Sequence, residues 1–264
     1  MGQNLIVTGM VLNAMPIGEY DKRITLLTKE RGKITAFARG ARKPNSQFLA
    51  ATNPFSFGEF ELFEGRSTYT VSKVTIQNYF RELTVQFVAA YYGFYFLEFA
   101  DYYCQENNDE LEMLKLLYQS LRALESTSFD NELVRVIFEC KALAINGEAP
   151  NVFACAKCNE EKELFWFSAD EARVLCIQCM EKMKREPLNK NLLSGYRKIQ
   201  DSTIYTMQYI ISSRVEKLYT FSVSPQVLKE LQQIMQEYTK KHIHHSFKSL
   251  KILEELSVSV SVPS

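Results

Sequence analysis

The sequence predicts an α+β multidomain chain, in which a small β-barrel comes first and an α-helical domain with an inserted four-cysteine segment follows. Three observations carry this prediction. The hydrophobic pattern has a period of two up to residue 79 and of about 3.6 beyond it. Two Cys-x-x-Cys pairs, Cys155 with Cys158 and Cys176 with Cys179, interrupt the helical pattern. Five strand-like stretches precede the first helical pattern, too close together for helical crossovers.

Length and composition are those of an ordinary globular protein. The chain has 264 residues, of which 46% are hydrophobic and 23% charged, enough for one or two domains with their own cores. The sequence shows no apolar run long enough to span a membrane and no signal peptide. Cys104 and Cys140 stand alone within helical patterns and are expected in the core. This cysteine usage fits a reducing compartment, so a cytoplasmic protein is expected.

Five strands are expected in the first 79 residues. Their ends are marked by turn-forming residues, such as Gly32 between the second and third strands, where a positive φ is expected. The predicted strands cover residues 4–14, 21–29, 33–39, 55–63 and 68–77. This strand count suggests the five-stranded oligonucleotide-binding (OB) barrel, so residues 1–79 are predicted to form an OB-type β-barrel domain.

Positive charge gathers in the barrel, although the net charge of the whole chain is zero. Residues 1–45 contain eight Lys or Arg and three Asp or Glu. In the third strand, Lys33, Phe37 and Arg39 share one face by alternation. Cations around an aromatic ring are what single-stranded nucleic acid requires, because the cations meet phosphates and the ring stacks on a base. A solvated sheet face with one exposed Phe is an equally weighted interpretation.

The basic loop, residues 40–46, extends this cationic region beyond the third strand. The candidate DNA-binding residues are Lys22, Arg23, Arg31, Lys33, Phe37, Arg39, Arg42 and Lys43.

Beyond residue 79 the chain is predicted to form helices. An aromatic-rich helix over 80–104 is followed by a helix capped at Asn108 or Asp109 and by one that Asp130 caps and Gly147 ends. After the cysteine pairs, helices are expected over residues 201–219, 225–242 and 247–256. Residues 80–150 and 186–257 therefore form the predicted helical domain, which residues 151–185 interrupt.

The cysteine pairs predict a four-cysteine zinc knuckle. Seventeen residues separate Cys158 from Cys176, within the spacing typical of zinc ribbons. Short strands at 163–167 and 172–175 would form a hairpin that brings the pairs together. Four thiolates, Cys155, Cys158, Cys176 and Cys179, leave no open position on a tetrahedral ion, so one structural Zn²⁺ is expected. Two disulfides or chance are the alternatives, and nearby lysines leave open whether the segment touches DNA.

Catalytic motifs are missing from the sequence. It has no Gly-rich phosphate loop, no His-Glu-x-x-His and no nucleophile elbow, so the protein is not expected to be an enzyme. Its three histidines, His242, His244 and His245, lie close together. They could form a second metal site, but a solvated helix end is the preferred interpretation.

A set of short motifs is spread along about 250 residues of the chain. In the predicted barrel they are Val11-Leu12, Tyr20-Asp21-Lys22, Leu26-Leu27-Thr28, Arg31-Gly32-Lys33 and Ala38-Arg39-Gly40-Ala41-Arg42. In the middle and near the end they are Leu143, Gly147, Pro150, Cys155, Cys158, Tyr238 and Lys248-Ser249-Leu250. In this order they resemble the RecO family of DNA repair and recombination mediators. One departure is Asn159, where the family frequently has a glycine at positive φ.

The resemblance implies what the protein does. It implies binding of single- and double-stranded DNA and annealing of complementary strands. It implies work with RecR, and often RecF, to help RecA load onto DNA covered by the single-stranded-DNA-binding protein. A groove for the acidic tail of that protein and a nucleoid-associated location are further expectations. Some members lack the cysteines, so the metal is not essential to the family's activity. The alternative function is a zinc-ribbon accessory factor that binds RNA or another protein.

Overall fold

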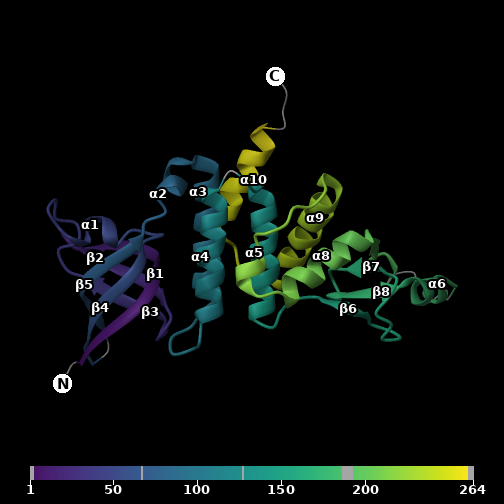
Figure 1. Ribbon diagram of the computed structural model, residues 1–264, viewed down its shortest axis with the longest axis horizontal. Coiled ribbons are helices and arrows are strands. Elements are labelled where there is room, and N and C mark those ends of the chain that lie inside the picture. The colour runs from purple at the N-terminus through teal and green to yellow at the C-terminus, as the bar shows by residue number, and fades with distance from the viewer. Residues whose placement is uncertain (1–2, 67, 127, 186–192, 261–264) are drawn as a thin grey trace. The chain divides into compact units, whose positions relative to one another are not determined.

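The protein folds into two compact units, seen in a computed structural model that describes residues 3–66, 68–126, 128–185 and 193–260 (Figure 1). The first unit contains Met1–Ser128 and Phe247–Ser264, and the second contains Phe129–Ser246. None of the helices within the described ranges combines the length and apolar character needed to cross a membrane.

A closed five-stranded barrel occupies the start of the first unit, as the sequence predicts. Its strands are β1 (Gln3–Ile17), β2 (Asp21–Thr28), β3 (Gly32–Ala38), β4 (Phe57–Glu64) and β5 (Tyr69–Asn78). They are ordered β1-β2-β3-β5-β4, and β4 pairs back onto β1. All neighbours are antiparallel except β3 and β5, whose parallel seam has two residue pairs, Ala36 with Tyr69 and Phe37 with Thr70. This is the predicted OB-type barrel.

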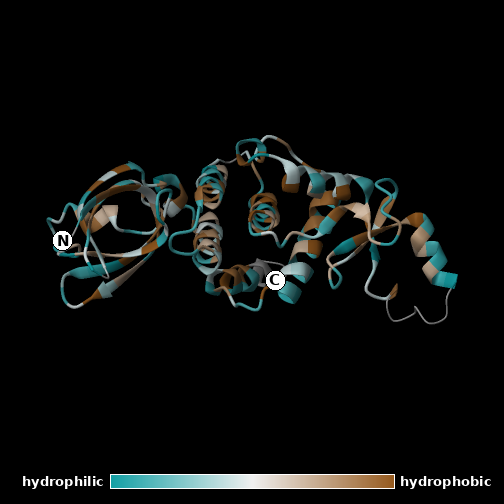
Figure 2. Cartoon of the chain, turned by 90° about the horizontal axis from the view of Figure 1, so that it is seen from below, coloured by the Kyte–Doolittle hydropathy of each residue, from teal (hydrophilic) through white to brown (hydrophobic). Residues whose placement is uncertain are grey.

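Alternation places the barrel core. Hydrophobic and hydrophilic residues alternate along the strands (Figure 2), and residues such as Ile24, Ile34 and Phe60 are fully buried inside. Two expectations need correction. The first strand, predicted over residues 4–14, is too short, because β1 continues to Ile17 and has a bulge between Val11 and Asn13. A short helix that was not predicted, α1 (Phe48–Ala51), contributes Phe48 to the core.

The first unit also contains four further helices: α2 (Arg81–Val85), α3 (Phe87–Tyr103), α4 (Leu111–Glu125) and α10 (Lys248–Val260). The single long helix predicted over 80–104 is therefore wrong. It breaks at Gln86, whose backbone is extended, after the β-branched residues Thr84 and Val85. Phe247, just before α10, packs its ring against Tyr95 and Phe99 of α3.

The second unit packs helices against a small sheet. Its helices include α5 (Asn131–Ile145), α8 (Asp201–Ser212) and α9 (Pro225–His242), and a 3-10 helix η2 covers Val215–Lys217. Asp130 caps α5 by accepting from the backbone of Glu132, as predicted, and Gly147 with φ 74° follows its end. The predicted helix over 201–219 is too long, because Ser213 is extended and ends α8.

The sheet of the second unit, called the ribbon sheet here, has the strand order β6-β8-β7-β9. Its strands are β6 (Asn151–Cys155), β7 (Leu164–Ser168), β8 (Arg173–Cys176) and β9 (Arg197–Lys198), and α6 (Ile177–Arg185) follows β8. The hairpin of β7 and β8 was predicted, whereas β6, β9 and α6 were not.

Candidate metal centre and nucleic-acid interface

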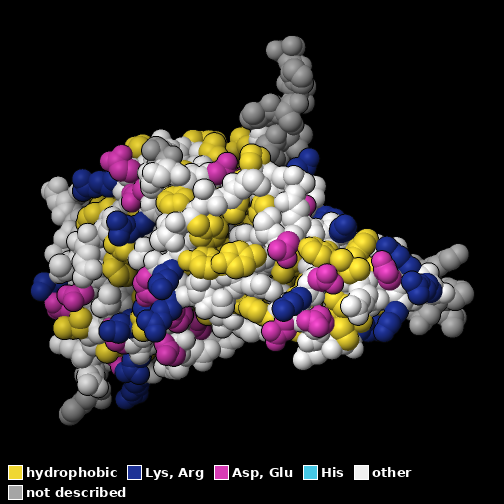
Figure 3. All heavy atoms as spheres, turned by 45° about the vertical axis from the view of Figure 1, so that its right-hand side comes forward, with side chains coloured by type: hydrophobic (Ala, Val, Ile, Leu, Met, Phe, Trp, Pro, Cys, Tyr) yellow, Lys and Arg dark blue, Asp and Glu magenta, His cyan; other side chains and the backbone are white. Residues whose placement is uncertain are grey.

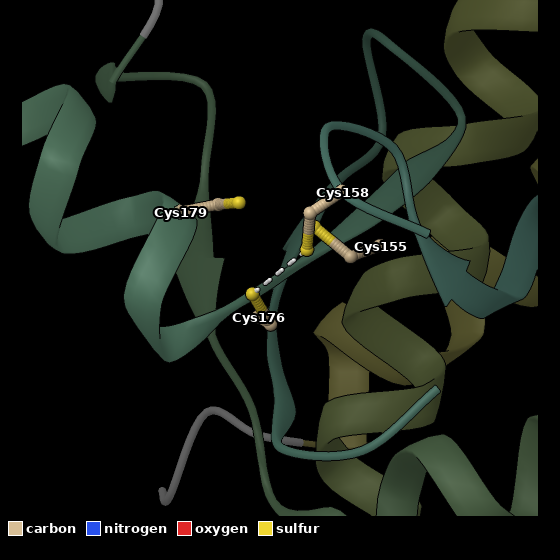
Figure 4. Close-up of side chains that lie close together, drawn as sticks. All are labelled: Cys155, Cys158, Cys176 and Cys179. Atoms are coloured by element: carbon tan, nitrogen blue, oxygen red, sulfur yellow. Dashed lines mark hydrogen bonds between the residues drawn. The ribbon is translucent and has the colours of Figure 1, made fainter. Parts of the chain in front are cut away.

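The four predicted cysteines come together. Their sulfur atoms all lie within 4.8 Å of one another, and the Sγ atoms of Cys158 and Cys176 are 3.6 Å apart. Figure 4 shows the side chain of Cys179 pointing toward the other three. Sulfurs around a tetrahedral zinc ion with Zn–S bonds of about 2.3 Å are separated by roughly 3.8 Å. The spacing therefore fits a metal ion held by four thiolates.

Local structure positions each sulfur. Cys155 ends β6 and Cys158 lies in the turn that follows, while Cys176 ends β8 and Cys179 lies in the first turn of α6. The turn after β6 closes through a hydrogen bond from the Asn159 N–H to the Cys155 carbonyl, and Asn159 has φ 62°. Asn159 thus adopts the left-handed conformation expected from the sequence.

The thiols differ in acidity. Burial opposes ionisation of Cys155, but backbone N–H groups of Cys176, Lys157 and Cys158 directed at its sulfur lower its pKa to about 6. Burial raises the pKa of Cys176 and of Cys179. One sulfur is thus prepared to be a thiolate, the form that binds metal. A positive ion among the four sulfurs would favour the thiolate form of the others.

The other candidate metal site does not form among the described residues. The Nε2 atom of His242 lies 2.7 Å from the Ala169 carbonyl oxygen, and its ring lies 4.3 Å from that of Tyr238. His244 and His245 are exposed. Within the described ranges, the four cysteines are the one group of three or more His, Cys, Asp or Glu that could hold a metal ion.

Cys104 and Cys140 are core residues, as expected. Both side chains are buried, and burial raises the pKa of each thiol, that of Cys140 to about 12. Neither thiol is therefore a reactive nucleophile.

The predicted DNA-binding residues fall into three groups in the structure. The first group lies on the outer face of the barrel. Arg23 of β2 pairs across strands with Phe37 of β3 on one side and with Met15 of β1 on the other. Phe37 pairs in turn with Thr70 of β5, so a row of side chains crosses four strands. Arg39 continues the outer face of β3 and is exposed.

The second group surrounds the turn between β1 and β2. Arg42 donates to the carbonyls of Gly18 and Glu19, at 3.3 and 3.1 Å, and the ammonium of Lys43 lies 5.6 Å from the centre of the Tyr20 ring. Burial, with a smaller effect of the neighbouring Arg42 charge, lowers the pKa of Lys22.

Lys22 in addition donates to the Leu49 carbonyl and to Oδ1 of Asn53, so it also fastens α1 to the barrel. Asp21 accepts a 2.7 Å hydrogen bond from the N–H of Gly40, which ties the basic loop to this turn.

The third group has protein partners. Lys33 forms an ion pair with Asp101 at 3.1 Å and also donates to the Asp101 carbonyl. Arg31 lies 3.6 Å from a carboxylate oxygen of Glu64. Their positive charges are therefore balanced within the protein, unlike that of Arg39, for which no ion pair occurs among the described residues.

Two residues of this surface were not predicted to bind DNA. Tyr20 is 44% exposed beside the basic loop, and Met15 is 47% exposed at the end of the outer row. An aromatic ring in a turn flanked by cations could have indicated Tyr20. Met15 could not be placed, because its neighbours depend on the register of β1 with β2.

The fold and the cysteine cluster define a class: OB-barrel proteins with a helical domain that carries a four-cysteine cluster able to hold a metal ion. Comparison with known sequences agrees. The profile of the family described as Recombination protein O N terminal matches residues 1–80, and that of Recombination protein O C terminal matches residues 85–251. The chain belongs to the recombination protein O (RecO) family.

Relatives match along nearly their whole length. The chain is 30% identical to the DNA repair protein RecO of Acetivibrio thermocellus over 253 residues, covering 96% of this chain and 97% of that protein. It is 28% identical to the DNA repair protein RecO of Alkaliphilus metalliredigens, covering 94% and 98%. It is also 28% identical to the protein of the same name from Shouchella clausii, covering 94% and 93%.

Proposed function

We propose that this protein is a recombination mediator in DNA repair that binds single- and double-stranded DNA and anneals complementary strands. The observation that carries the proposal is the outer face of the barrel, where Arg23, Phe37 and Arg39 lie together beside the basic loop. Family membership supports the DNA repair role, because the relatives are named DNA repair proteins.

Binding through this face is mainly electrostatic. Arg39, Arg42 and Lys43 are exposed and meet phosphates, while Phe37 or Tyr20 stacks on an unpaired base. Each phosphate that is neutralised releases counterions, so affinity falls steeply as salt rises. Annealing follows when two strands are held with their bases free and their mutual repulsion screened.

The test is fluorescence anisotropy of a labelled oligonucleotide at several salt concentrations. Replacing Arg39, Arg42 and Lys43 by Ala is expected to weaken DNA binding and to flatten the salt slope by about 2, since each phosphate contact on a single strand contributes roughly 0.7. The control replaces Lys29, Lys248 and Lys251, three exposed cations of the same unit, by Ala. Equal binding by both variants would contradict the proposal.

The same titration with RNA separates the alternative function. A recombination mediator binds DNA at least as tightly as RNA of the same length, whereas a clear RNA preference would favour an RNA-binding accessory factor. The proposed role is not enzymatic, in line with the expectation from the sequence motifs.

The metal is proposed to be one structural Zn²⁺. Four sulfurs that enclose a single point suit zinc, and they leave no position for a substrate or water. Zinc would hold β6, β8 and α6 together, since each of these elements carries or ends on a ligand.

The partners are proposed from the resemblance to the family. The proposed partners are RecR, with RecF, and the acidic tail of the single-stranded-DNA-binding protein, in a cytoplasmic, nucleoid-associated setting. The measurement is assembly of RecA on DNA covered by that protein, with and without this chain and RecR. Faster assembly only when both are present is expected, and no change in rate would contradict the mediator role.

A further inference from the structure

Trp166, the one tryptophan of the chain, lies on the ribbon sheet between cations. The ammonium of Lys184, in the last turn of α6, lies 4.5 Å from the centre of its ring. In the sheet, Trp166 of β7 pairs directly with Lys198 of β9, so both side chains share one face. A partly exposed aromatic ring therefore has a cation above it and another beside it.

This face carries α6 and lies on the side of the ribbon sheet opposite α9. The neighbouring pair, Phe167 with Arg197, has the opposite orientation, and Arg197 forms a 3.0 Å ion pair with Glu237 of α9. Phe167 is buried on that side. The Trp166 side is consequently the outer face of the ribbon sheet.

The cations of α6 and β9 near this face form no ion pairs in the part of the chain that the structure describes. These cations are Lys182, Lys184 and Arg185 in the last turn of α6 and Lys198 of β9. The acids of the turn between β7 and β8 are engaged elsewhere: Asp170 pairs with Lys241, and Glu171 pairs with Arg173. Figure 3 shows Lys and Arg side chains beside hydrophobic ones, with Asp and Glu side chains among them, at the part of this unit that carries α6.

We propose that the outer face of the ribbon sheet is a second nucleic-acid contact, which binds a single strand independently of the barrel. Lys182, Arg185 and Lys198 meet phosphates, and a base packs against the part of Trp166 that Lys184, which covers one face of the ring, leaves exposed. Cations that the protein leaves unpaired around an aromatic ring favour a polyanion with π-faces over a protein partner. The inference rests on the proposed function only in taking nucleic acid as the ligand. A chain with two such contacts can hold two strands.

The experiment uses Trp166 as its own reporter in the full chain. A labelled oligo-dT strand is titrated while its anisotropy and the Trp166 emission are both recorded, together with the protection of Trp166 from acrylamide. The ribbon variant is Lys182→Gln with Arg185→Gln, which leaves Trp166 and Lys184 in place. The matched control is Lys229→Gln with Lys240→Gln, two exposed cations of α9. The barrel variant with Ala at Arg39, Arg42 and Lys43 is titrated in parallel.

DNA is expected to quench and protect Trp166 in the wild type, in the α9 control and in the barrel variant. The ribbon variant is expected to need several-fold more DNA for the same quenching. Unchanged Trp166 emission at any DNA concentration, or equal quenching of the ribbon variant and the wild type, overturns the proposal. The barrel site is tested separately: if the barrel variant keeps wild-type anisotropy, the barrel proposal fails while the Trp166 result still decides this one.

Discussion

The ammonium of Lys33 lies 3.1 Å from Oδ1 of Asp101, which ties strand β3 of the barrel to helix α3. The backbone of the same residue donates to the Gln105 carbonyl at 3.0 Å, so this end of the β2–β3 hairpin is held by the segment after α3. A cation that the sequence pattern assigns to DNA thus has a structural partner. The cations available for phosphates lie at the opposite end of β3, at Arg39 and in the basic loop.

Replacing Lys33 by Ala is therefore expected to affect stability more than DNA binding. Loss of a partly exposed ion pair and its hydrogen bond should lower the free energy of unfolding by about 1 kcal/mol. Urea unfolding and oligonucleotide anisotropy measure the two effects. Arg39→Ala is the control, with the reverse pattern expected: weaker DNA binding and nearly unchanged stability. A larger loss of DNA affinity from Lys33→Ala than from Arg39→Ala would place the DNA at the α3 end.

Asp21 is expected to hold the basic loop in its binding position. Asp21→Ala removes the acceptor for the Gly40 N–H, whereas Asp21→Asn keeps an oxygen acceptor, and both remove the same negative charge. The Ala variant should bind DNA several-fold more weakly than the Asn variant and be about 1 kcal/mol less stable. Anisotropy and urea unfolding of the two variants test this. Equal DNA affinities would show that the hydrogen bond does not orient the loop.

The four-cysteine segment is expected to depend on its metal. Replacing Cys155 and Cys158 by Ser should abolish about one equivalent of bound zinc and lower the Tm by more than about 5 °C, equivalent to roughly 2 kcal/mol. Elemental analysis and thermal unfolding measure these effects, and Lys157→Ser, an exposed change in the same turn, is the control. DNA binding by the barrel should survive. If the loss in free energy of DNA binding exceeded the loss in free energy of unfolding, this segment would be the principal DNA contact.

Ionisation of Tyr238 is expected to lower the stability of the second unit at alkaline pH. Its hydroxyl donates a 2.6 Å hydrogen bond to the Glu148 carbonyl, and burial, followed by the charge of Glu148, raises its pKa to about 12. The unfolded chain loses this proton near pH 10, so the contribution of the group is complete below that pH and is lost as pH rises toward 12.

Tyr238→Phe should therefore lower the free energy of unfolding by about 1 kcal/mol at neutral pH and less above pH 10. Chemical unfolding at several pH values measures the difference between wild type and variant. Tyr205→Phe, at an exposed position, is the control and should change the free energy of unfolding neither at neutral pH nor above pH 10. A constant difference between wild type and Tyr238→Phe across the pH range would show that the hydroxyl is not protected from ionisation.

Much of the fold follows from local patterns. Alternation defines the barrel strands because one face of each is buried, and Asp130 marks the start of α5 because its side chain caps that helix. The break at Gln86 and the two-residue strand β9 could not be found this way. The break at Gln86 depends on how α2 ends. Strand β9 exists only because Arg197 and Lys198 pair with β7, about 30 residues earlier in the chain.

The two candidate sites differ in how much the sequence reveals. Metal ligation requires four sulfurs at set spacings, so the cysteine cluster is visible in the sequence and the structure brings it together. A cationic surface has no such constraint. Alternation places Lys33 and Arg39 on one face, but only the tertiary structure shows that Asp101, 68 residues from Lys33, neutralises one of them.

Among the described residues, two residue pairs join β3 and β5 where the barrel closes, Ala36 with Tyr69 and Phe37 with Thr70. Few ladder hydrogen bonds hold the cylinder shut along this line, whereas β1 and β4 share eight residue pairs. Brief separation of the two strands there costs less than elsewhere in the barrel. Amide hydrogens along this line should exchange with solvent sooner than those of the β1–β4 ladder. The line runs beside the row of side chains formed by Met15, Arg23, Phe37 and Thr70. A strand of DNA bound across both β3 and β5 would therefore slow their separation.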